Sequence, residues 1–205
     1  QIREGHNRLL FDELESGTVD IVYSAYSMSA MAFTYDLIYS EPILLAMPAD
    51  HPLAGSVDPV QQLPLTPYYI KPELVRNCDF IVLIPEQGMG AIARDMFHKY
   101  NLNPNIVMET QKHETAMRLA SAGMGMVFTP VRTPLRIPLV KPMAYFSIEN
   151  PIFTRSRGVY YSKYVPLSEA ARCFIHVFNE VYNHESSLKI PDCHLIIPPP
   201  PINNV

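Results

Sequence analysis

The sequence contains no apolar run long enough to cross a lipid bilayer. Pro, Glu or Asp interrupts each candidate run within about ten residues, whereas a membrane-spanning helix needs roughly 18 consecutive apolar residues. A surplus of basic residues is absent as well, because 16 Lys and Arg residues stand against 20 Asp and Glu residues and give a formal net charge of -4. Nucleic-acid-binding domains usually carry clustered Lys and Arg. We therefore expect this chain alone neither to span a membrane nor to hold DNA.

Cysteine is scarce and is not arranged in pairs. Cys78, Cys173 and Cys193 form no C-x-x-C motif, which favours neither a disulfide framework nor a zinc site. The adjacent Asp192, Cys193 and His194 cannot by themselves surround one metal ion. The chain also begins at Gln1 without a basic and then apolar leader, so we expect a fragment of a longer protein without a signal peptide. These features predict reduced thiols, no metal and a cytoplasmic location.

Signatures of catalysis are missing too. His113 and Glu114 begin an H-E-x-x-H pattern, but Met117 stands where the second His is required. The sequence also contains no G-x-S-x-G motif and no P-loop lysine. We predict that the chain is not an enzyme and that it needs no cofactor.

One enzymatic alternative rests on the sequence GMGAIA at residues 88–93. This segment follows a strand pattern, opens a helix pattern and precedes Glu109 by about twenty residues, as the dinucleotide fingerprint G-x-G-x-x-A requires. Three residues, 85–87, separate the strand from the first glycine. That spacing favours a loop whose backbone N–H groups face a cleft at a helix N-terminus. A nicotinamide-dependent enzyme stays as the alternative.

What the sequence does contain is an alternation of strand and helix patterns, which is typical of an α/β fold. Between residues 79 and 130 the alternation predicts a parallel sheet covered by helices, with Gly123 as the left-handed residue after one of them. The Pro-rich stretch from Pro52 to Pro72 predicts a crossing segment between two domains. The predicted helices cover residues 7–17, 89–100, 113–123 and 171–184, and the predicted strands cover residues 19–26, 37–48, 79–84, 105–109, 126–130 and 158–164.

Several blocks of the sequence resemble the effector-binding domain of LysR-type transcriptional regulators. The pattern L-x-x-G-x-x-D-I-V (residues 14–22) is followed by PILLAMPADHPLA (42–54), MRLASAGMGMVFTP (117–130) and VYYSKYVPLSEAARCFIHVF (159–178) in the family's order. The resemblance runs from Gln1 to about Tyr182. It implies a two-lobed, periplasmic-binding-protein-like (type II) α/β fold with an interlobe cleft. Lobe one would be residues 1–67 plus 158–184, lobe two residues 68–157, and residues 185–205 a Pro-rich, extended tail.

The same resemblance implies a function. A small organic effector would bind in the cleft and alter how a separate N-terminal helix-turn-helix, which is not in this chain, holds DNA. The protein would be a homodimer through lobe one, with no membrane partner. A solute-binding protein of an uptake system shares the fold and stays as a second alternative.

The family's domain normally begins with a strand and a helix that this sequence lacks. A lobe-one sheet without that strand would leave backbone groups unpaired. We expect another segment to fill the gap, and the short apolar run HLII at residues 194–197 or a partner chain are the candidates.

The predicted effector site lies where strand ends and helix starts converge, because ligands of open α/β sheets bind outside the carboxyl ends of the strands. The residues assigned to this rim are His6, Asn7, Tyr26, Ser27, Gln87, Gly88, Met89, Thr110, Phe128, Thr129 and Pro130. Helix N-termini near Asn7, Gly88 and Lys112 favour a negative charge, but the rim itself contains no Arg or Lys to pair with a strong anion. We therefore predict a weakly charged or aromatic-bearing organic acid as the effector, with Tyr26, Met89 and Phe128 in contact with its apolar part.

Overall fold

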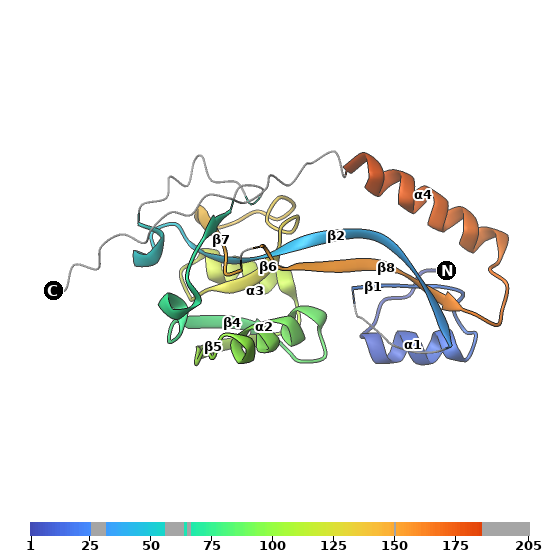
Figure 1. The fold of residues 1–205 in the computed structure, drawn as a ribbon, viewed down its shortest axis with the longest axis horizontal. Coiled ribbons are helices and arrows are strands. Elements are labelled where there is room, and N and C mark those ends of the chain that lie inside the picture. Colours follow the sequence, from blue (N-terminus) through green and yellow to red (C-terminus); the bar gives the residue numbers. More distant parts are fainter. Residues whose placement is uncertain (26–31, 56–63, 65–66, 150, 186–205) are drawn as a thin grey trace. The chain divides into compact units, whose positions relative to one another are not determined.

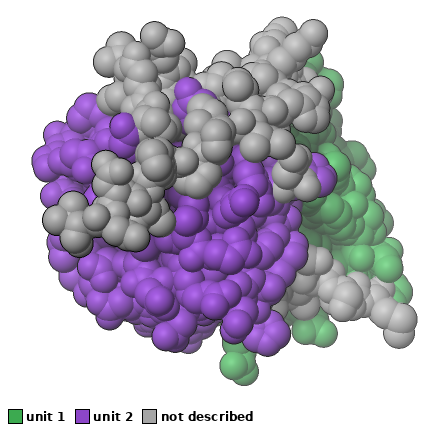
Figure 2. Space-filling view, turned by 60° about the vertical axis from the view of Figure 1, so that its left-hand side comes forward, with its two compact units in different colours: residues 1–41, 155–189 green, residues 42–154, 190–205 purple. Residues whose placement is uncertain are grey.

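The computed structural model describes residues 1–25, 32–55, 64, 67–149 and 151–185. The chain forms two compact units, residues 1–41 with 155–189 (unit 1) and residues 42–154 with 190–205 (unit 2), as Figure 2 shows by colour. The strand HLII and the tail expected at residues 185–205 lie outside the described residues, apart from residue 185. The predicted lobe boundaries at residues 67/68 and 157/158 stay a prediction. Residues 42–67 group with unit 2 because residues 43–48 pair with two strands of that unit.

Unit 1 is a small antiparallel sheet with helices on both faces (Figure 1). Its elements are α1 (Asn7–Glu15), β1 (Val22–Ser24), the first part of β2 (Phe33–Pro48), β8 (Thr154–Ser162) and α4 (Glu169–Glu185). On the α1 face, Phe11 meets Tyr160 edge to face at 5.0 Å and packs with Leu14 and Val22 in a small core. On the α4 face, Tyr23 lies 4.8 Å from Phe178. Successive residues of a strand point to opposite faces of the sheet, so Val22 packs on the α1 side and Tyr23 packs against α4.

The strand order in this sheet is β1-β8-β2, with Val22 opposite Tyr160. Among the described residues, no strand lies outside β1 in that order. β1 is shorter than the strand predicted at residues 19–26. α1 ends at Glu15, with Ser16 as its C-cap, and Gly17 follows at φ 72°. A left-handed residue directly after the helix is the termination that the sequence predicted.

A buried ion cluster holds β2 to β8 in unit 1. Glu41 Oε1 accepts hydrogen bonds from Arg155 Nε at 2.9 Å and from Arg157 Nε at 2.7 Å. The Glu41 and Arg155 side chains are 3 % and 7 % exposed. Buried charges are tolerated only when they are paired in this way.

Unit 2 contains a mixed sheet and a parallel pair of strands. Its elements are the second part of β2, η1 (Pro52–Ala54), β3 (Tyr68–Tyr69), η2 (Pro72–Val75), β4 (Asp79–Leu83), α2 (Gly88–Lys99), β5 (Asn105–Thr110), α3 (His113–Ser121), β6 (Val127–Pro130) and β7 (Met143–Ser147). β2 pairs antiparallel with β6 and β7, and β3 pairs parallel with β7. The short elements η1 and β3 lie within the stretch from Pro52 to Pro72, where the sequence predicted only a crossing segment.

The predicted alternation of parallel strands and helices between residues 79 and 130 is confirmed. β4 pairs parallel with β5, and a parallel bridge between Phe80 and Met126 brings the chain leading into β6 alongside β4. β4 is buried from Phe80 onward, and Phe80 meets Phe97 of α2 at 5.0 Å and Phe128 of β6 at 5.7 Å. These contacts make β4 the centre of the unit 2 core.

Candidate functional site

The carboxyl ends of β4, β5 and β6 lie at one edge of unit 2, because the three segments run parallel. The Ile84 N–H, directly after β4, donates to the Thr110 carbonyl at the end of β5 at 3.0 Å. The N-terminus of α2 follows β4, and that of α3 follows β5. We call this the carboxyl edge. It combines strand ends with two helix N-termini, which is the arrangement at which open α/β sheets bind small ligands.

Gln87 is the N-cap of α2, without a hydrogen bond from its side chain to the helix. The first helical N–H groups, at Gly88, Met89 and Gly90, have no carbonyl four residues earlier within the helix. Gly90 permits close packing here: a Cβ at this position would lie 2.0 Å from the Ile84 carbonyl oxygen. The second glycine of GMGAIA is therefore explained by helix-to-strand packing.

Glu109, the acid that would bind the ribose in the dinucleotide fingerprint, forms an ion pair with Arg94. Arg94 Nη2 donates to Glu109 Oε2 at 2.7 Å, and Arg94 Nη1 donates to the Leu83 carbonyl at 2.9 Å. Arg94 thus ties α2 to the ends of β4 and β5. Glu109 is thus paired with Arg94 in this structure, which does not favour the nicotinamide alternative.

Polar side chains connect the starts of the helices with the strand ends at the carboxyl edge. His113 Nε2 and Thr129 Oγ1 lie 3.0 Å apart, which joins the first residue of α3 to β6. Thr110 Oγ1 accepts the Lys112 N–H at 3.3 Å. Thr110 and Thr129 therefore lie at one edge of unit 2, and their assignment to an effector site stays a prediction. The sequence analysis considered His113 only as a metal ligand. Its position at the start of a helix that follows a strand is the pattern that could have placed it in the predicted site.

Two of the predicted site residues contribute their side chains to the hydrophobic core. Met89 is 6 % exposed and Phe128 is 4 % exposed, and the Phe128 ring packs 5.9 Å from Phe97. Pro130 is buried as well. At these positions the backbone lies at the edge while the side chains pack inward. Tyr26 and Ser27 lie outside the described residues.

His6 and Asn7 lie at the N-terminus of α1 in unit 1. His6 is the N-cap, and its Nδ1 accepts the Leu9 N–H at 3.4 Å. Asn7 Oδ1 accepts a hydrogen bond from Ser24 Oγ at 2.9 Å, which ties the helix start to the end of β1. Unit 1 therefore repeats the arrangement of a helix N-terminus beside a strand's carboxyl end, and Ser24 is the partner that the sequence reasoning missed.

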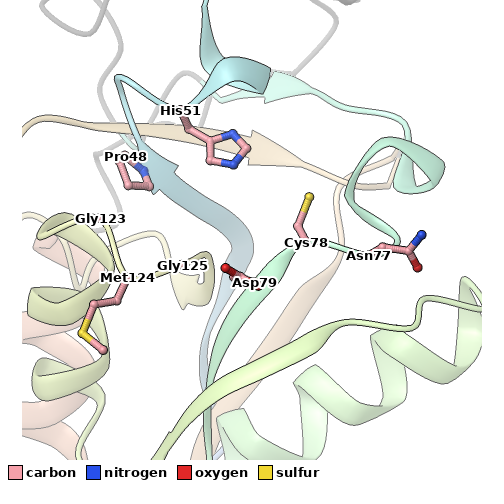
Figure 3. Close-up of a pocket in the computed structure, with 8 residues that line it drawn as sticks. All are labelled: Pro48, His51, Asn77, Cys78, Asp79, Gly123, Met124 and Gly125. Carbon is pink, nitrogen blue, oxygen red and sulfur yellow. The ribbon is translucent and has the colours of Figure 1, made fainter.

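Unit 2 also has a pocket of about 290 Å³ that the sequence did not predict (Figure 3). It is lined by Pro48, His51, Asn77, Cys78, Asp79, Gly123, Met124 and Gly125. Asp79 begins β4 and Gly125 precedes β6. The pocket therefore lies at the amino ends of these strands, whereas the carboxyl edge lies at their other ends.

Within the part of the chain that the structure describes, no three His, Cys, Asp or Glu side chains gather in a way that could hold a metal ion. Asp192, Cys193 and His194, which the sequence analysis considered and rejected as metal ligands, lie outside that part. No described helix is both long enough and apolar enough to cross a membrane.

Comparison with known protein families assigns the fold. The profile of the LysR substrate binding domain matches residues 1–183. The chain belongs to this family. The alternatives of an uptake-system binding protein and of a nicotinamide-dependent enzyme are therefore not favoured, and the resemblance seen in the sequence is confirmed.

A curated relative of this LysR domain is the uncharacterized HTH-type transcriptional regulator YnfL of Escherichia coli (strain K12). It is 27 % identical over 182 residues, which are 87 % of this chain and 57 % of YnfL. The chain covers 41 % of another such regulator, YybE of Bacillus subtilis (strain 168). The chain thus spans about half the length of these relatives.

Solved structures of LysR effector-binding domains share the two-lobed, periplasmic-binding-protein-like α/β fold. The CcmR regulatory domain of Synechocystis PCC6803 in complex with 2-PG superposes with a TM-score of 0.71 and 15 % identity, over 86 % of this chain and 79 % of that domain. The effector-binding domain of QuiR in complex with shikimate gives a TM-score of 0.65 and 14 % identity, over 89 % and 80 %. At these identities the likeness concerns the fold alone.

Proposed function

We propose that this LysR domain binds a small organic effector and thereby changes how a helix-turn-helix domain, carried outside this chain, holds DNA. The family assignment supports the regulatory role. The observation that carries the binding role is the carboxyl edge of unit 2, where the starts of α2 and α3 stand at the ends of parallel strands. An effector that prefers one of two conformations shifts their populations by its difference in affinity.

The residues proposed to contact the effector fall into two groups, one in each unit. In unit 2 they are Gln87, Gly88, Met89, Thr110, Phe128, Thr129 and Pro130, where Met89 and Phe128 would act through their backbone. In unit 1 they are His6, Asn7, Tyr26 and Ser27. The half-buried Thr110 hydroxyl and the first-turn N–H groups of the first set offer hydrogen-bond donors to an acceptor-rich ligand, whereas the Thr129 side chain is buried, so Thr129 would act through its backbone.

The effector class that this chemistry favours is a weakly charged organic acid. The apolar contact that the sequence predicted for the Met89 and Phe128 side chains is not supported, because both pack in the core. Each helix N-terminus stabilises a nearby negative charge by about 0.3 to 1 kcal/mol. The proposed contact residues include no Arg or Lys, which a strongly charged dicarboxylate would normally require. The CcmR regulatory domain was solved in complex with 2-PG, and the effector-binding domain of QuiR was solved in complex with shikimate.

We propose that the domain acts by binding and not by catalysis. We also propose that it acts in the cytoplasm, where a bacterial regulator meets its DNA. The family and its relatives are transcriptional regulators, and this supports both statements. No cofactor is required for the proposed role.

We further propose that the protein is a homodimer through lobe one. The outer face of α4 exposes Phe174, Val177 and Val181 at 43 %, 49 % and 49 %, while Phe178 and Tyr182 pack inward on Tyr23 and Tyr39. An apolar stripe exposed on a helix is typical of an interface. In sedimentation velocity, we expect a dimer at tens of micromolar that Val177→Glu disrupts and that Val165→Glu, an exposed valine outside α4, leaves intact. A wild-type monomer at that concentration would contradict the homodimer.

A thermal-shift screen of small carboxylates, sugars and amines tests the effector site. A ligand at about 100 times its Kd raises the free energy of unfolding by roughly 2.7 kcal/mol. We expect a carboxylate to raise the Tm and expect Gln87→Trp and Thr110→Val to remove the shift. Thr115→Val, an exposed threonine on α3, is the matched control and should keep it. If only sugars or amines raise the Tm, the proposed ligand class is wrong, and if Gln87→Trp binds the carboxylate normally, the site is elsewhere.

A further inference from the structure

The pocket at the amino ends of β4 and β6 is a candidate for a second binding site, independent of the proposed effector site. β4 has five residues, so at about 3.3 Å per residue its first and last residues are about 13 Å apart. A ligand the size of a small organic acid cannot occupy both places. The volume of about 290 Å³ corresponds to roughly ten waters at about 30 Å³ each, which leaves room for a short carbon chain with a polar group at each end.

The side chains that surround this space carry one negative charge. Figure 3 shows the Asp79 carboxylate, the Cys78 sulfur and the rings of His51 and Pro48 around it, whereas the Met124 side chain and the Asn77 amide point away. Asn105 Nδ2 donates to Asp79 Oδ1 at 2.7 Å and holds the carboxylate in place. None of the residues that line the pocket is a Lys or an Arg. The pocket therefore repels anions.

The other two ionisable groups of the pocket are neutral at pH 7. Burial lowers the pKa of His51 and raises the pKa of the Cys78 thiol. His51 Nδ1 accepts the Leu53 N–H at 3.1 Å, so the ring proton of the neutral imidazole is on Nε2. The Asp79 charge is thus not cancelled within the pocket.

The C-terminus of α3 adds partial negative charge at the same place. The Met124 N–H donates to the Leu119 carbonyl and the Gly123 N–H donates to the Ala120 carbonyl, the paired bonds of a Schellman motif. Gly123 supplies the left-handed residue, at φ 101°. This end of the helix macrodipole is negative and stabilises a nearby cation.

Gly125 brings this helix end next to the acid. A Cβ at residue 125 would lie 2.8 Å from the Asp79 carbonyl oxygen, so only glycine allows the two segments to approach this closely. The residue has φ 157°, which a side chain also disfavours. The negative end of α3 and the Asp79 carboxylate therefore border the same pocket.

We propose that this pocket binds a small organic ammonium compound, with its ammonium group on the Asp79 carboxylate beside the C-terminus of α3. The carbon chain of the ligand lies against the ring of Pro48. An anionic ligand is disfavoured by the same charges.

Alkylation of Cys78 reports occupancy of the pocket directly, because its sulfur borders the space, and 1,4-diaminobutane is the probe. Iodoacetamide labelling of the purified chain is followed by mass spectrometry of the peptides. At about ten times its Kd, the diamine should slow the labelling of Cys78 about tenfold, because about one site in eleven stays free. Cys173, an exposed thiol of unit 1, is the internal control and should react at an unchanged rate.

Two isosteric variants locate the charge that the ammonium group needs. Asp79→Asn keeps an oxygen that accepts from Asn105 and removes the charge, so the diamine should no longer protect Cys78. Asp95→Asn removes the same charge from the exposed face of α2 and should leave the protection unchanged.

The proposal is overturned if millimolar diamine leaves the labelling of Cys78 unchanged in the wild-type chain. It is also overturned if succinate protects Cys78 as well as the diamine does, or if Asp79→Asn is still protected. If Asp79→Asn does not fold, the comparison of the diamine with succinate in the wild-type chain still shows whether the pocket prefers a cation. Binding of carboxylates at the carboxyl edge is measured separately, so either site can fail without the other.

Discussion

Removal of the Glu41 carboxylate should destabilise unit 1 strongly, because two guanidinium groups depend on it. Glu41 Oε1 accepts from Arg155 Nε at 2.9 Å and from Arg157 Nε at 2.7 Å, and it lies 2.8 Å from Arg155 Nη2 in an ion pair. Arg155 is 7 % exposed, and Arg157 is 27 % exposed. The Glu41→Ala variant leaves the Arg155 charge buried without a partner, which costs about 3 to 5 kcal/mol.

The two arginines should differ in their own contributions. Arg157 reaches water and lies over the Tyr23 ring at 5.8 Å, so it keeps part of its stabilisation when Glu41 is lost. Its replacement by Ala also leaves Glu41 paired with Arg155. We therefore expect Arg157→Ala to cost less than Glu41→Ala.

Urea unfolding at pH 7, followed by circular dichroism, measures these differences in free energy. The matched control is Glu114→Ala, which breaks an exposed pair with Arg118 whose side chains are 50 % and 56 % exposed. Exposed pairs of this kind contribute about 0.3 to 0.5 kcal/mol. If Glu41→Ala costs no more than Glu114→Ala, the cluster does not hold β2 to β8 and the reasoning from burial is refuted.

Two further predictions concern unit 2. Gly90→Ala should destabilise the chain by about 1 to 3 kcal/mol through overpacking, because the new Cβ would lie 2.0 Å from the Ile84 carbonyl oxygen, whereas Gly88→Ala meets nothing within 4 Å and should be neutral or stabilising. Equal effects of the two changes in urea unfolding would contradict the packing argument. Burial lowers the pKa of His51 below its ordinary 6.5, so the unfolded chain binds the proton more readily and stability should fall as the pH drops below about 6.5. His51→Asn, which keeps a capping oxygen, should flatten this part of the pH profile, and an unchanged profile would show that His51 does not cause it.

Much of unit 2 could be predicted from the sequence because its helices and strands carry strong periodicities. α2 places Met89, Ala93, Met96 and Phe97 on one buried face, and the predicted bounds of 89–100 compare with Gly88–Lys99 in the structure. The short apolar run of β4 was equally clear, since it is buried from its second residue onward.

The direction of individual side chains at the carboxyl edge could not be predicted. Phe128 and Thr129 are neighbours in β6, and the sequence does not say which of them faces the core ring of Phe97 and which meets His113. A strand pattern fixes the alternation, but the packing of α2 and α3 decides which face each residue takes.

Features built from distant segments gave no sequence signal. Glu41 and Arg155 are separated by 114 positions, and the pocket combines residues near 48–51, 77–79 and 123–125. Gly123 was noted in the sequence, but only for its role after a helix. A polar cluster of this kind becomes visible only when the fold brings its members together.

The central claim, that an organic acid binds at the carboxyl edge of unit 2, is tested most directly by an NMR titration of the isotopically labelled chain. With a carboxylate found in the thermal-shift screen, we predict that the backbone amide signals of Gln87, Gly88, Gly90, Thr110 and Thr129 shift as the acid is added, while those of Asp79 and Gly125 stay in place. Shifts confined to residues away from the carboxyl edge, or to the pocket around Asp79, would contradict it.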